Sequence, residues 1–173
     1  MLKNLKYLLF TFLISNVVFS QEKMTLQDQK TIPATPTWSF FSDSYRYSGA
    51  VKVQIGNNGK GGTLLVQVET SDPTFYIGGT LYLFLEDGNV ITCTDKNVRS
   101  ISDKFIQSYY LITPSELLLL KKNKLTDVRF RIFGTDSQFS SRTGFFTAQN
   151  KIKMFGLPDK SYDTVTDLKQ LFN

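Results

Sequence analysis

Short runs of alternating apolar and polar residues dominate the chain from about residue 50 onwards. The pattern is clear in 50–55, 63–68 and 81–85, and it returns in 105–112 and 128–133. Alternation with a period of two is typical of strands that bury one face and expose the other. The sequence therefore predicts a mainly β domain, built either as an antiparallel β-sandwich or as one strongly curved sheet.

Segments rich in glycine and asparagine separate these runs. Gly56–Gly62 holds residues that tolerate positive φ, which predicts a tight reversal between two strands. The pair Asp87-Gly88 between two β-rich runs is a strong hairpin signal. The acids of Glu86–Asn89 lack the regular spacing and closing glutamate of an EF-hand, so we interpret this segment as a turn rather than a calcium loop.

Two short helices interrupt the β pattern. Thr113, Pro114 and Glu116 match a capping box with proline at the first helical position, which predicts a helix over about 114–122. Apolar residues at helical spacing predict a second helix over about 164–172. The strand, helix, strand passage over 109–133 could form one parallel crossover, so an α+β fold remains the alternative.

The first twenty residues have the pattern of a signal peptide. Lys3 and Lys6 precede an apolar run of thirteen residues, 7–19, which is too short for the roughly 30 Å hydrocarbon core of a bilayer. Small side chains before the bond place cleavage between Ser20 and Gln21. We therefore expect an exported protein, periplasmic or extracellular, with no stable transmembrane span after cleavage.

The remaining chain divides into two parts. Residues 21–37 contain two prolines and few large apolar groups, which predicts an extended leader without its own core, and 38–173 form a single β-rich domain. Cys93 is the only cysteine, so no internal disulfide can form, and its place in a predicted strand indicates a buried thiol.

Composition excludes large classes of chemistry. The 173-residue chain has no histidine, so histidine metal sites and the usual catalytic triads cannot form, and we predict no metal, no cofactor and no catalytic residues. Removing residues 1–20 takes away two lysines and no acid, so the net charge falls from +5 to +3. This modest excess does not indicate a nucleic-acid partner. Two acid pairs that lie close in sequence, Glu69 with Asp72 and Glu86 with Asp87, leave a carboxylate-dependent hydrolase acting on envelope or extracellular glycan as the alternative to a non-enzyme.

Two clusters are candidate contact surfaces. The first is aromatic, since exposed aromatic rings stack on sugars and anchor protein interfaces, although aromatic residues of a first strand are also typical core. The second is basic and could meet anionic groups, although its residues also fit a helix C-terminus followed by the solvent face of a strand. The aromatic cluster contains Trp38, Phe40, Phe41, Tyr45 and Tyr47, and the basic face contains Lys121, Lys122, Lys124, Arg129 and Arg131.

The ordered series 81–91, 110–117, 120–121 and 125–129 resembles a group of small exported proteins of uncharacterised function from Bacteroidota-type bacteria. The likeness covers about residues 81–133, together with the signal peptide. It implies a Gram-negative envelope address and a mostly β domain, and it carries no catalytic residues. We therefore expect an exported, non-enzymatic β domain that binds another envelope or extracellular component, protein or glycan, through one sheet face or edge.

Overall fold

The computed structural model of the chain describes residues 21–45, 47–70, 72, 74–102, 104–134, 143–152 and 160–173. The predicted signal peptide, 1–20, lies outside the described residues, and Gln21 is the first residue described. In the described part, no helix combines the length and apolar character that crossing a bilayer requires.

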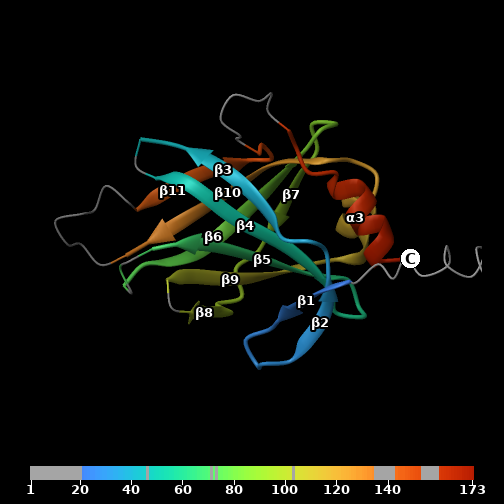
Figure 1. Cartoon of the computed structure of the whole chain (residues 1–173), viewed down its shortest axis with the longest axis horizontal. Helices are drawn as coiled ribbons and strands as arrows, with labels where there is room; N and C mark the ends of the chain where they lie inside the picture. Colours follow the sequence, from blue (N-terminus) through green and yellow to red (C-terminus); the bar gives the residue numbers. More distant parts are fainter. Residues whose placement is uncertain are drawn as a thin grey trace, which may run out of the picture.

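Eleven strands of the described chain form one antiparallel sheet (Figure 1). The strands are β1 (Glu22–Thr25), β2 (Thr31–Ala34), β3 (Trp38–Asp43), β4 (Ser48–Asn57), β5 (Gly62–Glu69), β6 (Tyr76–Leu85), β7 (Val90–Cys93), β8 (Arg99–Ser102), β9 (Phe105–Ile112), β10 (Leu125–Phe133) and β11 (Gly144–Gln149). Their order is β7-β6-β10-β11-β3-β4-β5-β9-β8, and β2 joins β1 to β4.

The structure confirms a mainly β fold with short helices. The sheet is one strongly curved layer rather than two packed sheets, and the passage from β9 to β10 is not a parallel crossover. Instead, β10 pairs antiparallel with both β6 and β11. The predicted hairpins form as β4–β5 and β6–β7, and Gly88 in the second turn has a φ of +85°.

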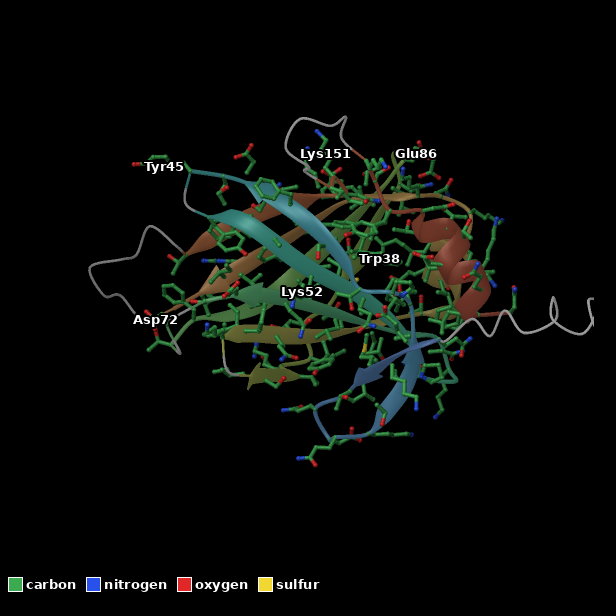
Figure 2. All side chains as sticks on the ribbon, in the orientation of Figure 1. Trp38, Tyr45, Lys52, Asp72, Glu86 and Lys151 are labelled. Atoms are coloured by element: carbon green, nitrogen blue, oxygen red, sulfur yellow. The ribbon has the colours of Figure 1, made fainter. Side chains whose placement is uncertain are left out.

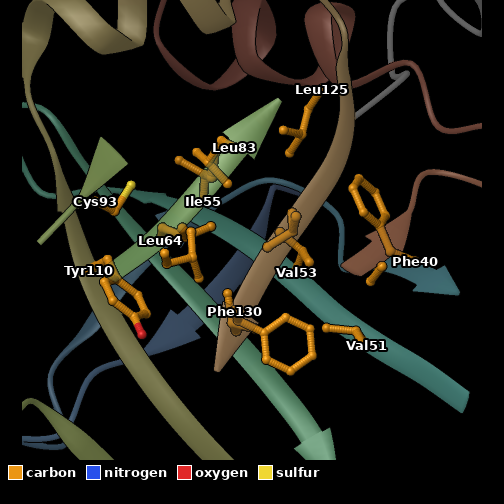
Figure 3. Packing of buried hydrophobic residues seen from close by; sticks show 14 of the residues in the cluster. Phe40, Val51, Val53, Ile55, Leu64, Leu83, Cys93, Tyr110, Leu125 and Phe130 are labelled. Atoms are coloured by element: carbon orange, nitrogen blue, oxygen red, sulfur yellow. The ribbon is translucent and has the colours of Figure 1, made fainter. Parts of the chain in front are cut away.

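The concave side of the sheet encloses the main hydrophobic core (Figure 3). Alternate residues of the strands point inward, among them the fully buried Phe40 of β3, Val53 of β4 and Phe130 of β10. Burying one such large side chain contributes roughly 1.5–3 kcal/mol. Because successive residues of a strand face opposite sides, burial of Phe130 directs Arg129 and Arg131 to the outer, solvent-facing side.

The two ends of the curved sheet meet at a seam between β6 and β9 without a continuous backbone ladder. The short strands fill this seam in a staggered way, because β7 pairs with Leu81–Phe84 of β6 and β8 pairs with Phe105–Ser108 of β9. Tyr110 of β9 then reaches across, and its hydroxyl lies 3.4 Å from the carbonyl oxygen of Gly79 in β6.

Side chains satisfy the backbone hydrogen-bonding groups on the seam-side edge of β6, which no neighbouring strand pairs with at residues 77–79. The Nε of Arg99 donates to the carbonyl of Ile77 at 2.7 Å, and the amide of Gly79 donates to Oδ2 of Asp95 at 2.7 Å. Arg99 and Asp95 also form an ion pair with each other. The pair therefore replaces two ladder hydrogen bonds that a partner strand would otherwise supply.

Residues 21–37, the expected leader, run extended but form a hairpin that packs on the sheet. Strands β1 and β2 lie against the outer side of β5 and β9, where Met24, Ile32 and Ala34 are buried with Leu65 and Tyr109. The expectation that this segment has no core is thus wrong. Met24, Ile32 and Ala34 face the same side of the hairpin, which is enough to cover a small second cluster.

Two helices close the end of the sheet opposite the β3–β4 turn (Figure 1). Helix α2 (Pro114–Leu120) begins with the predicted capping box, since the amide of Thr113 donates to Glu116 Oε2 at 2.8 Å and the amide of Glu116 donates to Thr113 Oγ1 at 3.3 Å. Helix α3 (Thr164–Leu171) begins at Asp163, which accepts from the amide of Thr166 at 3.1 Å. Both helices form close to where the sequence predicts them.

Replacing Asp95 by alanine is expected to lower the free energy of unfolding by about 1–3 kcal/mol. The substitution leaves the amide of Gly79 without its acceptor and Arg99 without its counter-ion. Urea denaturation followed by the fluorescence of Trp38, the only tryptophan, measures the change. Glu86→Ala, which removes an exposed acid from a turn, is the control and should change stability by less than about 0.5 kcal/mol. Equal effects of the two substitutions would contradict the role given to Asp95.

Cys93 is expected to resist thiol reagents in the folded protein. Its side chain is 2% exposed, and burial together with the negative charge of Glu116 raises its pKa to about 12, so almost no thiolate is present near about pH 8. A chromogenic disulfide reagent should therefore react only after denaturant is added. Rapid modification of the native protein, with no loss of secondary structure, would show that the thiol is accessible.

Candidate functional site

The structure does not assemble the predicted aromatic contact surface. Trp38 and Phe40 are 0% exposed in the core, which removes them from any such surface, and the indole nitrogen of Trp38 donates to Asp167 of α3 at 2.8 Å. Tyr47 is half-buried and its hydroxyl donates to the carbonyl of Ala50 at 2.9 Å. Only Tyr45 is fully exposed, at the tip of the β3–β4 turn (Figure 2). First-strand aromatic residues here serve mainly the core.

The predicted basic face divides into two parts. Lys121 donates to the backbone carbonyl of Phe172 at 3.0 Å, and Lys124 donates to Ser161, so these lysines hold the C-terminal segment against α2. Lys122 is exposed. Arg129 and Arg131, by contrast, lie on the outer face of β10. The helix end is structural, and the two arginines belong to a different surface.

The two acid pairs lie at opposite ends of the sheet, as Figure 2 shows for Asp72 and Glu86. The carboxylate of Asp72 accepts from the amide of Thr74 at 2.9 Å, and that of Asp87 accepts from the amide of Asn89 at 3.0 Å. These hydrogen bonds stabilise turns. Among the described residues, no group of three or more histidine, cysteine or acidic side chains could hold a metal ion.

The outer face of β6, β10 and β11 carries a row in which arginine guanidinium groups stack on aromatic rings. We call it the arginine–aromatic row. Each member contacts the next, and the order is Arg99, Tyr76, Phe133, Arg131, Phe145 and Arg129. Of these residues, the sequence indicated only Arg129 and Arg131 as a possible contact surface.

Two arginines share the rings at one end of the row. The guanidinium carbon of Arg131 lies 4.3 Å from the ring centre of Phe133 and 5.4 Å from that of Phe145. Arg129 approaches the same Phe145 ring at 5.1 Å. All three distances are within the roughly 6 Å range of cation–π attraction, so the rings hold the guanidinium groups in place.

The other end of the row joins the seam. The rings of Tyr76 and Phe133 stack with their centres 5.3 Å apart and their planes 10° from parallel. The guanidinium carbon of Arg99 lies 5.0 Å from the centre of the Tyr76 ring. Since Arg99 is also fixed by its bond to Ile77 and its ion pair with Asp95, this end is the more rigid one.

Strand register places the members of the row side by side. Arg131 lies directly opposite Phe145 in the β10–β11 pair, and Phe133 lies directly opposite Tyr76 in the β10–β6 pair. Side chains of directly opposed residues on one face are about 4.5–5.5 Å apart at Cβ and therefore touch. The row is thus a consequence of the pairing of strands distant in sequence.

Two glycines of β6 leave space for the row. A Cβ at Gly78 would lie 2.7 Å from Nη2 of Arg99, a position that the bonds of Arg99 to the seam do not allow to shift freely. Gly79 has a φ of +70°, which favours glycine, and a Cβ there would contact the ring of Phe133 at 3.6 Å. Larger residues at 78 would push Arg99 away from the Tyr76 ring.

The row is accessible to solvent and carries positive charge. Phe145 is 52% exposed and Tyr76 is 41% exposed, and both Arg129 and Arg131 are exposed. Among the residues that the structure describes, neither of these two arginines forms a salt bridge. Both guanidinium groups carry N–H groups that can donate to a bound anion.

Several hollows of the described chain lie away from the row, and two of them are as follows. A cavity of about 280 Å³ separates the β1–β2 hairpin from the segment between β7 and β8, and Leu26, Val98 and Tyr109 line it. A second, of about 240 Å³, opens at the end of the curved sheet beside Tyr47 and Glu69. Neither contains a member of the arginine–aromatic row.

Comparisons with protein-family models, with curated proteins and with solved structures give no match to this chain.

Two tyrosines, the half-buried Tyr47 and the buried Tyr110, are expected to make the protein less stable in alkali. Burial, reinforced at Tyr47 by the charge of Glu69, raises the pKa of Tyr47 to about 12, and burial likewise raises the pKa of Tyr110 to about 12. The pKa of each tyrosine is about 10 in an unfolded chain. The contribution of the two tyrosines to the free energy of unfolding is therefore complete below about pH 10 and is lost as the pH rises to about 12.

Urea denaturation between about pH 9 and 12 tests this expectation. The free energy of unfolding should fall across the upper part of this range, and the double variant Tyr47→Phe/Tyr110→Phe should fall less steeply. Because lysines also titrate in this range, the comparison between the two proteins is decisive. Identical slopes would contradict the tyrosine contribution.

Proposed function

We propose that the protein is an exported, non-enzymatic β domain that binds an envelope or extracellular glycan through the arginine–aromatic row. The observation that supports this proposal is the exposure of stacked aromatic rings on a sheet face, with guanidinium groups fixed between them. The signal-peptide pattern of residues 1–20 supports export.

A glycan fits this surface better than a folded protein partner. Protein interfaces concentrate binding energy in central, fully desolvated pockets, whereas the row is a line of rings across neighbouring strands. Phe145 is 52% exposed and Tyr76 is 41% exposed, so both rings offer apolar surface that a sugar ring can contact. A linear ligand can therefore contact several members at once.

The acid pairs favour binding over hydrolysis. A glycosidase requires two carboxyl groups about 5–9 Å apart across the scissile bond. Asp72 and Asp87, one from each pair, accept hydrogen bonds from the amides of their own turns. No acid belongs to the arginine–aromatic row, so we assign the row to binding alone.

Binding of the mature chain, Gln21–Asn173, to an envelope fraction from the producing cells tests the proposal. The fraction is used both untreated and after protease digestion, and the protein left in solution is measured. We expect binding to survive digestion and Phe145→Ala to weaken it by about tenfold, since the ring supplies contact area and holds two arginines, a loss of about 1.4 kcal/mol.

Leu118→Ala is the matched control, because Leu118 is 58% exposed on α2 and Phe145 is 52% exposed on β11. It should leave binding unchanged, while Phe145→Trp, which keeps a ring, should retain most of it. Full binding by Phe145→Ala would exclude the row as the contact surface. Loss of binding after protease digestion would identify a protein partner instead and overturn the glycan assignment.

A further inference from the structure

We infer that the ligand of the arginine–aromatic row is an acidic polysaccharide whose carboxylate groups pair with Arg129 and Arg131 while its sugar rings contact the exposed ring of Phe145. This inference rests on the proposed function and names the class of glycan. It depends on how the two guanidinium groups are held.

The guanidinium groups of Arg129 and Arg131 lie over aromatic rings while both arginines stay exposed, so their N–H groups remain accessible to a ligand. Arg131 lies near both Phe133 and Phe145, and Arg129 lies near Phe145. The N–H donors of arginine lie in the plane of the group, in a fork that matches the two oxygens of a carboxylate. A carboxylate can therefore pair with each arginine without displacing a ring.

The stacking also reduces the entropy that binding costs. A free arginine side chain samples many rotamers and loses that freedom when it binds an anion. The guanidinium carbon of Arg131 already lies 4.3 Å from the ring centre of Phe133 and 5.4 Å from that of Phe145, so these two rings restrict its side chain. Arg129 and Arg131 are thus ordered before an anion binds, and neither forms a salt bridge with a described residue.

The placement of the two arginines suits a polymer that carries repeated anionic groups. Arg129 and Arg131 are two residues apart on one face of β10, which corresponds to about 6.6 Å along the backbone of a strand. A chain with repeated carboxylates can engage both arginines at once, one carboxylate on each guanidinium group. The rings between and beside the forks then contact the uncharged parts of the same chain.

The charge distribution distinguishes this surface from a nucleic-acid site. Phosphate-binding surfaces gather many lysines and arginines, whereas the mature chain has a net charge of only +3. Two of the three lysines near α2 donate to Phe172 and Ser161, so they do not extend the row. A carboxylated sugar chain, with fewer charges per unit length than a nucleic acid, matches two forks separated by rings.

Isothermal titration of the mature chain with polygalacturonate, neutral dextran, dextran sulfate, polyglutamate and oligothymidylate tests the inference. We expect the tightest binding to polygalacturonate, no binding to neutral dextran, and a loss of at least tenfold between about 0.05 and 0.5 M salt, because exposed charges are screened. Arg129→Gln/Arg131→Gln should weaken polygalacturonate binding by at least tenfold. Lys122→Gln, which removes an exposed charge on the same polypeptide, should not.

The double variant Arg129→Lys/Arg131→Lys separates a specific pairing from simple charge attraction. It keeps both charges but loses the fork, so we expect binding reduced severalfold relative to the native protein. Full binding by this variant, tighter binding to dextran sulfate, to polyglutamate or to oligothymidylate, or equal binding to neutral dextran would each overturn the inference.

Competition separates failure of the inference from failure of the proposed function. If Phe145→Ala abolishes binding to the protease-treated envelope fraction but polygalacturonate neither binds nor competes, the row binds a glycan of another class. If Phe145→Ala binds the envelope fraction as well as the native protein does, the proposed function itself fails.

Discussion

The curved sheet depends on satisfying the seam-side edge of β6, where residues 77–79 have β10 on one side and no partner strand on the other. A sheet that bends until its ends meet must either continue its hydrogen-bond ladder or supply other partners for the exposed amides and carbonyls. Asp95 and Arg99 supply them for Gly79 and Ile77, at 2.7 Å in each case. This arrangement allows the sheet to enclose its core although β6 and β9 never pair.

The seam also determines how the candidate site is built. Arg99 bonds to the backbone of β6 and stacks on Tyr76, which in turn stacks on Phe133 of β10. The row therefore begins at the structural closure of the sheet and extends across it to Phe145. Gly78 permits this continuity, because any side chain at that position meets Arg99. Stability and the proposed binding surface share the same arginine.

Locally encoded features could be predicted from the sequence, and features that depend on register could not. The Asp87-Gly88 turn and the Thr113 capping box were predictable because a few adjacent residues determine them. Burial of Trp38 was not, since an aromatic residue in a first strand fits either core or surface. The stacking of Tyr76 on Phe133 requires the pairing of β6 with β10, across 57 positions of sequence, and no local pattern indicates it.

The protection of the sheet edges favours a face over an edge for the proposed contact with a ligand. The short strands β7 and β8 lie inside the seam, where β7 comes close to β9 and Arg99 of β8 bonds to β6. Edges arranged in this way offer little backbone for an added strand. The outer face of β10 and β11, by contrast, leaves Phe145 and two guanidinium groups uncovered although burial of Phe145 would stabilise the fold. The exposed Phe145 ring adds no buried apolar area to the core. Its exposure supports the proposal that this surface binds a ligand.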